Sequence, residues 1–242
     1  MNFIYKLITT LILIFSIHFP VIANEKSSTP INSKNADTDV IKIVETLKNK
    51  KKLIKTARLE SKVTYNLPFR KKLKLVQVYS IKKESNIHVD IFAIWKIKVA
   101  EFFTEDKRVI YKRLGKKDRI RNIGDFNLRI FNKYLDLPLT PLELNNFLLG
   151  MNLDSFNENY MYISNGDKLL LFNKTHKCII DLKTNEIEKV FINDKRGIEI
   201  TYSKYSPVEN EDINLPLYVE LKTKTFSMQI NFQNDIIINK EI

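Results

Sequence analysis

The feature that most constrains the fold of this chain is a strict alternation of apolar and polar residues over 226–232. Its apolar members are Phe226, Met228, Ile230 and Phe232, and its polar members are Ser227, Gln229 and Asn231. Because successive side chains of a β-strand point to opposite faces, this period of two predicts a strand with one buried and one solvated face. Strands of this kind are typical of antiparallel sheets.

The same alternation recurs in two runs, at about 57–114 and about 160–239, and predicts about eleven strands. In the first run the apolar positions include Leu73, Leu75, Ile87, Val89 and Ile91. Charged stretches such as 82–86 and 104–106 separate neighbouring strands, as an antiparallel meander requires. A single sheet of this width has to curl in order to hide its apolar face.

Three helices are expected, and the first two have the following bounds. The first, at about 37–51, begins near Asp37 and Asp39 and ends in a cluster of lysines, which suits the helix dipole. The first run of strands breaks at Gly115, and Asp125 then caps a short helix that continues to Leu135.

A third helix is predicted between Thr140 and Gly150. Thr140, Pro141 and Glu143 form the sequence of a capping box, and Gly150 is a typical helix stop. The apolar face of this helix comprises Leu144, Phe147 and Leu148.

The N-terminal segment has the features of an export signal. Lys6 precedes an apolar stretch over 7–19, and Val21 and Ala23 provide the small residues of a cleavage site, so residues 1–23 are expected to be removed. The alternative is an uncleaved anchor. The only cysteine, Cys178, lies far from this site, so no lipid anchor is expected. Residues 24–36 are expected to form a flexible leader, and 37–242 a single domain in the periplasm.

The charge balance limits the partners. The formal net charge is +12, and loss of residues 1–23, whose only charge is Lys6, lowers it by one. A positive field suits anionic lipid headgroups, although a compositional bias toward lysine explains it equally well. No aromatic stacking pattern indicates nucleic-acid binding.

No arrangement of residues indicates catalysis or a cofactor. His176 and Cys178 lie two residues apart on one strand and so share a face, but two ligands do not make a zinc site. The acidic pairs at 105–106 and 211–212 fall in expected turns, and no Gly-x-Ser-x-Gly motif is present. The chain is therefore expected to be no enzyme and to hold no metal. An enzyme would instead require a polar cleft with perturbed carboxylates.

Three segments carry a resemblance to a known family. Residues 137–150, LPLTPLELNNFLLG, are similar to its Pro-Leu to Gly segment, with matches at Pro138, Leu139, Leu142 or Leu144, Phe147, Leu148 and Gly150. Residues 200–203, 215–221 and 228–232 resemble its C-terminal strands. Residues 91–100 lie where the family has a loop with an exposed leucine, and Trp95, or else Ile94, takes that position. Over about residues 37–240 the chain resembles the LolA/LolB lipoprotein-carrier superfamily, in its LolB-like branch.

The resemblance implies an α+β fold that is mostly antiparallel β, an unclosed half-barrel with an N-terminal helix and a two-helix lid over an apolar cavity. Acyl chains of a lipoprotein or another envelope lipid would bind there, and a monomer would carry them toward the outer membrane. An anionic membrane surface and a membrane donor complex are further implied partners. The cavity and lid residues would be Leu73, Leu75, Ile87, Val89, Ile91, Leu139, Leu144, Phe147, Leu148, Phe226, Met228, Ile230 and Phe232.

Two alternatives stay open. Each proposed cavity residue has the composition of an ordinary core residue, since a core and a cavity wall are built alike. The fold would then serve as an envelope module that binds a protein partner and has a filled interior. Trp95 either packs in the core or, as we expect from the flanking Lys96 and Lys98, touches a membrane together with Ile94. The family's lipobox cysteine is missing.

Overall fold

A computed structural model describes residues 31–32, 38–67, 72–82, 86–93, 96–105, 108–114, 121–125, 139–156, 160–194, 197–209, 211–233 and 236–240. Its helices are α2 (Thr38–Leu53), α4 (Pro141–Leu149) and the short 3-10 helix η3 (Asp154–Phe156). Helix α2 confirms the first predicted helix. It has Asp39 in its first turn, lysines in its last turn, and Val40, Val44 and Leu47 on its buried side.

The strands form two runs along the chain, after the two-residue strand β1 (Ile31–Asn32). The first run is β2 (Thr56–Asn66), β3 (Leu73–Lys82), β4 (Asn86–Phe92), β5 (Lys98–Glu105), β6 (Arg108–Arg113) and β7 (Arg121–Asp125). The second run is β8 (Met161–Asn165), β9 (Lys168–Phe172), β10 (His176–Asp181), β11 (Glu186–Ile192), β12 (Ile198–Pro207), β13 (Asn214–Lys222), β14 (Ser227–Phe232) and β15 (Ile237–Ile238).

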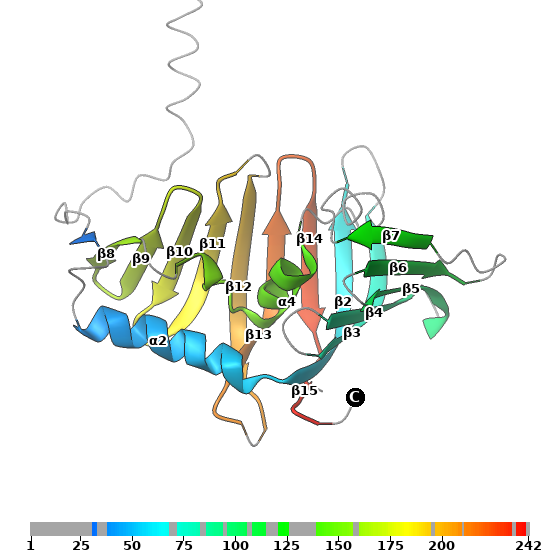
Figure 1. The fold of residues 1–242 in the computed structure, drawn as a ribbon, viewed down its shortest axis with the longest axis horizontal. Coiled ribbons are helices and arrows are strands. Elements are labelled where there is room, and N and C mark those ends of the chain that lie inside the picture. The colour runs from blue at the N-terminus through cyan, green and yellow to red at the C-terminus, as the bar shows by residue number, and fades with distance from the viewer. Residues whose placement is uncertain are drawn as a thin grey trace, which may run out of the picture.

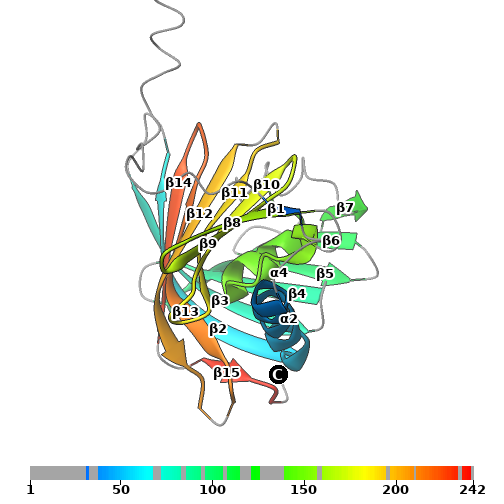
Figure 2. The same cartoon turned by 90° about the vertical axis from the view of Figure 1, so that its left-hand side faces the viewer.

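All fifteen described strands belong to one antiparallel sheet. The two runs join where β14 pairs with β2, with Ile230 opposite Val63. The sheet order begins at β1 and ends at β7, and these two strands do not pair with each other, so the sheet curls without closing (Figures 1 and 2). The predicted fold class, a mostly antiparallel, unclosed half-barrel, is confirmed.

The two α-helices, α2 and α4, lie on the inner, concave side of the curved sheet (Figure 2). Helix α4 contacts β4 and β13, which lie in opposite halves of the sheet order. Burial along β2 alternates residue by residue, with Ala57, Leu59 and Val63 buried and Arg58 exposed. The hydrophobic core therefore occupies the space between the concave face and the helices.

Asp125, which is expected to cap a short helix, ends a strand, and the extended backbone of a strand end is compatible with a cap residue. Asp125 is the last residue of β7 and lies opposite Arg108 of β6. Strand β7 follows Gly115 as a sixth member of the first run, because pairing with β6 overrides a local sequence with weak strand propensity. Residues 126–135 lie outside the described residues.

The N-terminal segment is described at two residues only. Ile31 and Asn32, within the expected leader, pair with Tyr162 and Met161 of β8. The expected export signal and its cleavage site lie outside the described residues. Within the described ranges, no helix combines the length and apolarity that crossing a bilayer requires.

Candidate functional site

Helix α4 is held across the sheet by the local sequence that predicted it. The Glu143 amide donates to Thr140 Oγ1 at 3.2 Å, and the Thr140 amide donates to Glu143 Oε2 at 2.7 Å. This reciprocal pair confirms the predicted capping box. Gly150 ends the helix with a left-handed φ of 68°. Its missing Cβ would lie 3.1 Å from Pro216 and 3.2 Å from the Tyr205 hydroxyl, so the helix end fits tightly against β12 and β13.

Most of the predicted cavity and lid residues lie together between α4 and the concave face. Ten of them are buried: Ile87, Val89, Ile91, Leu139, Leu144, Phe147, Leu148, Met228, Ile230 and Phe232. Leu75 and Phe226 are partly buried against the same core. The exception is Leu73, which is 47% exposed because it is the first residue of β3, at the rim of the sheet.

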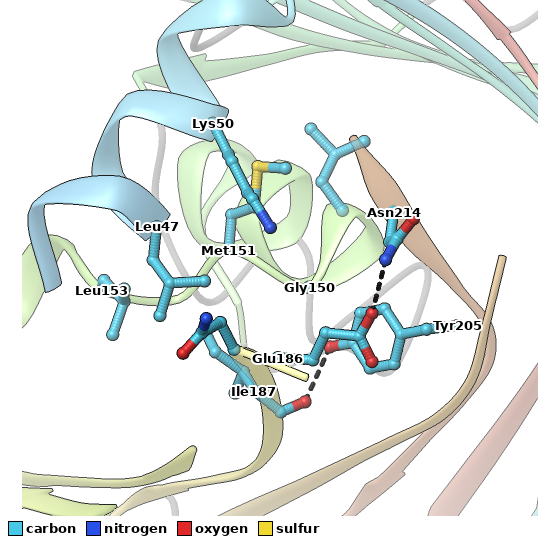
Figure 3. A pocket seen from close by; sticks show the side chains of 11 residues that line it. Leu47, Lys50, Gly150, Met151, Leu153, Glu186, Ile187, Tyr205 and Asn214 are labelled. Atoms are coloured by element: carbon cyan, nitrogen blue, oxygen red, sulfur yellow. Dashed lines mark hydrogen bonds between the residues drawn. The ribbon is translucent and has the colours of Figure 1, made fainter. Parts of the chain in front are cut away.

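A small pocket opens at one edge of this interior, where α2, the end of α4 and three strands meet (Figure 3). Lys50 extends into it from α2. On the opposite wall, the Tyr205 hydroxyl donates to the Ile187 carbonyl at 2.6 Å, and Asn214 Nδ2 donates to Glu186 Oε1 at 2.8 Å. Burial raises the pKa of Tyr205, so its phenol stays protonated. The pocket volume of about 20 Å³ holds roughly one water molecule.

A polar clasp joins α2 to the segment after α4. Lys51 Nζ lies 2.7 and 2.9 Å from the two carboxylate oxygens of Asp154, and Asn146 Nδ2 donates to the same carboxylate at 2.6 Å. One turn earlier, Lys48 Nζ donates to the Phe156 carbonyl at 3.1 Å. Partial burial lowers the pKa of Lys48. The clasp defined by Lys51, Asn146 and Asp154 thus fixes the two helices to each other.

The concave face also contains a buried polar cluster that was not predicted from the sequence. Ser61, Tyr65, Gln77 and Tyr79 are each less than a tenth exposed. Gln77 Nε2 donates to the Tyr65 hydroxyl at 3.0 Å, Tyr79 donates to Gln77 Oε1, and Ser61 donates to the Gln77 carbonyl at 3.3 Å. Burial, and secondarily Tyr65, raise the pKa of Tyr79. One sequence signal could have indicated the cluster: Gln77 occupies a position on β3 where the alternating pattern predicts an apolar residue.

Cys178 and His176 do share a strand and a phase, as predicted, but their surroundings differ. Cys178 is fully buried, and burial raises the pKa of its thiol. His176 is partly exposed, and its Nδ1 lies 2.8 Å from the Thr175 hydroxyl. The two expected membrane-touching residues, Ile94 and Trp95, lie outside the described residues. Ile97, which follows them, is 61% exposed.

Among the described residues, one group of three potential metal ligands gathers, on the convex face: His88, Asp90 and Glu101. Lys98 Nζ stands 2.7 Å from Asp90 and 2.6 Å from Glu101, and Lys112 Nζ stands 3.0 Å from Glu101. The hydrogen bond from Lys98 lowers the pKa of Glu101. The group is arranged as an ion-pair network, since two ammonium groups already neutralise its carboxylates.

The fold has relatives among solved structures. A DUF1329 family protein from Desulfovibrio piger superposes with a TM-score of 0.62 at 10% identity, over 84% of this chain and 94% of that one. A LolA superfamily protein from Nitrosomonas europaea gives 0.53 at 8% identity, over 82% and 94%. A domain described as outer membrane lipoprotein-sorting, from Vibrio parahaemolyticus, gives 0.56 at 10% identity, over 84% and 93%.

These likenesses show that the chain has the LolA-type fold, as the resemblance in its sequence predicted. No protein-family model matches the sequence, and no curated protein matches it at significant similarity.

Proposed function

We propose that this protein is an exported, non-enzymatic carrier that binds the acyl chains of lipoproteins, or of another envelope lipid, between its helices and the concave face of its sheet. The observation that carries the proposal is the cover of that face. Two helices lie over an apolar wall, and contacts through side chains hold them there, whereas the strands are bound into the sheet by backbone ladders. The likeness to a lipoprotein-sorting domain supports this proposal.

The energetics favour such a ligand. Each buried methylene contributes about 0.8 kcal/mol, so an acyl chain binds an apolar wall without needing hydrogen bonds. The pocket at the edge of the interior has a volume of only about 20 Å³, so a chain enters only when a helix moves. The clasp opposes this movement weakly. Asp154 is 45% exposed, and an ion pair as exposed as this contributes about 0.2–1 kcal/mol.

The edge pocket is the natural opening of the interior. It lies between α2 and the end of α4, the two elements that must separate, and Leu47, Leu149, Met151 and Leu153 give it an apolar side. Lys50 extends into it and would attract an anionic headgroup (Figure 3). At the rim of the sheet, exposed Leu73 and Ile97, with the expected loop residues Ile94 and Trp95, would touch a membrane during transfer.

The test is binding of a fluorescent acyl probe to delipidated protein. Saturable binding is expected, and Asp154→Asn should bind the probe about two- to fivefold faster, because the weakened clasp opens more often. The matched control is Asp167→Asn. It removes a more exposed ion pair, to Lys183 at 2.5 Å, from a hairpin turn that does not hold the helices, and should leave the rate unchanged. Absence of saturable binding by the unmodified chain would contradict the proposal.

A second function is favoured by one observation, the tight filling of the interior. Leu144, Phe147 and Leu139 are fully buried around α4, as in a solid core. A module that uses this fold to bind a protein partner needs no cavity. It predicts that neither the unmodified chain nor Asp154→Asn takes up the probe.

A further inference from the structure

The convex face of the sheet carries a cleft that the carrier proposal does not use. It has a volume of about 320 Å³ and lies over β2, β3, β4 and β5. Its lining residues are Arg58, Ser80, Lys82, Asn86, Ile87, His88, Phe103 and Thr104. It therefore offers far more room than the pocket of the concave interior.

The strand register places the polar members of the lining in two adjacent rows. Arg58 lies opposite Ser80, Ser80 opposite His88, and His88 opposite Phe103. Lys82 and Asn86 face each other two residues further along the same strands. Neighbouring strands are about 4.8 Å apart and successive same-face residues about 7 Å, so these groups all border one small space.

Four of the donors in this space are uncommitted among the described residues. Within the described ranges, the side chains of Arg58, Ser80, Lys82 and Asn86 make no ion pair or hydrogen bond. In the next row on the same face the charged groups are paired. There Asp90 and Glu101 are bound by Lys98 and Lys112 at 2.6 to 3.0 Å.

The electrostatics of the cleft favour an anion. Among the described residues, its lining holds the positive charges of Arg58 and Lys82 and no carboxylate. The nearby carboxylate Asp90 is already neutralised by Lys98 and lies 3.1 Å from His88 Nε2. A guanidinium, an ammonium, a hydroxyl and an amide supply donors from several directions, which matches an anion with three or four acceptor oxygens better than a carboxylate with two.

We propose that this convex-face cleft binds a phosphoryl group, with Arg58 and Lys82 as the charged contacts and Ser80 and Asn86 as the neutral donors. Phe103 supplies an apolar surface beside these donors that accommodates an organic substituent of the phosphate. The source is either the headgroup of a phospholipid or a soluble phosphate ester, since both present the same chemistry. The site stands apart from the concave interior and does not depend on acyl-chain binding.

The experiment follows backbone amide signals of the whole folded chain by NMR during titration with glycerol 3-phosphate. Saturable shifts are expected at residues 80–82, 86–88 and 103, with tighter binding than acetate at equal ionic strength. The double variant Arg58→Gln/Lys82→Gln should bind about tenfold more weakly. Lys62→Gln is the matched control. It removes an exposed charge from the same face of β2 outside the cleft, and should change binding by less than about twofold.

A second arm identifies the source of the phosphate. Co-sedimentation with phosphatidylglycerol vesicles but not phosphatidylcholine vesicles, lost in the double variant, would identify a lipid headgroup. Binding of glycerol 3-phosphate without co-sedimentation would identify a soluble ester. The proposal is overturned if neither probe binds, if acetate binds as tightly as the phosphate ester, or if Lys62→Gln weakens binding as much as the double variant. The unliganded spectra report whether each variant is folded.

Discussion

The two faces of the one sheet differ in what their polar groups are bonded to. On the concave face, Ser61, Tyr65, Gln77 and Tyr79 bond to one another inside an apolar wall. On the convex face, some polar groups, such as Arg58 and Lys82, are bonded to nothing among the described residues. A ligand on the concave face would therefore have to replace protein contacts, whereas a ligand in the convex cleft would replace none among the described residues.

This difference separates stability from binding. Packing and buried hydrogen bonds on the concave face stabilise the fold, so changes there lower the free energy of unfolding. Exposed charges on the convex face contribute little to stability, so changes there should leave the fold intact and test the proposed binding alone. Four comparisons test this contrast, taken in order of decreasing expected effect.

The largest effect is expected for Phe147→Ala in α4. Phe147 is fully buried against the concave face, and loss of its ring should lower the free energy of unfolding by about 3–5 kcal/mol. Urea unfolding measures this. Leu142→Ala, on the exposed side of the same helix, should cost less than about 1 kcal/mol. Equal losses from both variants would show that α4 does not cover a packed face.

The next effect concerns the end of α4. Gly150→Ala and Gly166→Ala both place a side chain at positive φ, but only at Gly150 would the new Cβ approach other atoms, those of Pro216 and Tyr205. Gly166→Ala should cost about 1–2 kcal/mol from backbone strain. Gly150→Ala should cost at least about 1 kcal/mol more, because close packing resists an added methyl group. Thermal or urea unfolding of the pair isolates this packing term, and equal costs would mean that the helix end is loose.

Truncation of the polar cluster comes third. Gln77→Ala leaves the buried Tyr65 and Tyr79 hydroxyls without their partner and should lower the free energy of unfolding by about 1–3 kcal/mol. The comparison is Gln229→Ala, which loses a partly buried hydrogen bond to Glu220 and should cost less than about 1 kcal/mol. If Gln229→Ala were the more harmful change, the two faces would not differ as described.

The smallest effect is a pH dependence from the convex network. Lys98 lowers the pKa of Glu101 in the folded state, so this carboxylate contributes stability above its ordinary pKa and loses it as the pH falls through the lowered value. Between about pH 6 and about pH 3 the unmodified chain should therefore lose more stability than Glu101→Gln. A steeper acid loss in Glu101→Gln would reverse the sign of the argument.

Much of the fold could be predicted because its signals are local. The alternation over 226–232 reports burial on one side of β14, and the sequence from Thr140 to Gly150 encodes both ends of α4. Strand β7 could not be predicted in the same way. Its sequence, RNIGD, has no apolar alternation, and its last residue, Asp125, is also a good helix cap.

The parts of the candidate sites that were missed depend on contacts between distant residues. Lys51 and Asp154 are 103 residues apart, and Arg58 reaches the cleft only because β2 pairs with β3 in one register. Gln77 could be recognised in the sequence as a polar residue at a position where β3 otherwise has apolar residues. Its partner Tyr65 could not, because only the pairing of β2 with β3 brings that residue close. The sequence pattern identified most of the buried lining positions. It could not show how tightly they pack, because a cavity wall and a core have the same composition.

The central claim is that the helices open to admit an acyl chain to the concave face. Native mass spectrometry of the protein purified from its own envelope tests it most directly. The account predicts a species heavier than the chain by the mass of an acylated molecule, which organic extraction removes. A spectrum that contains only the bare chain, from protein never exposed to extraction, would contradict it.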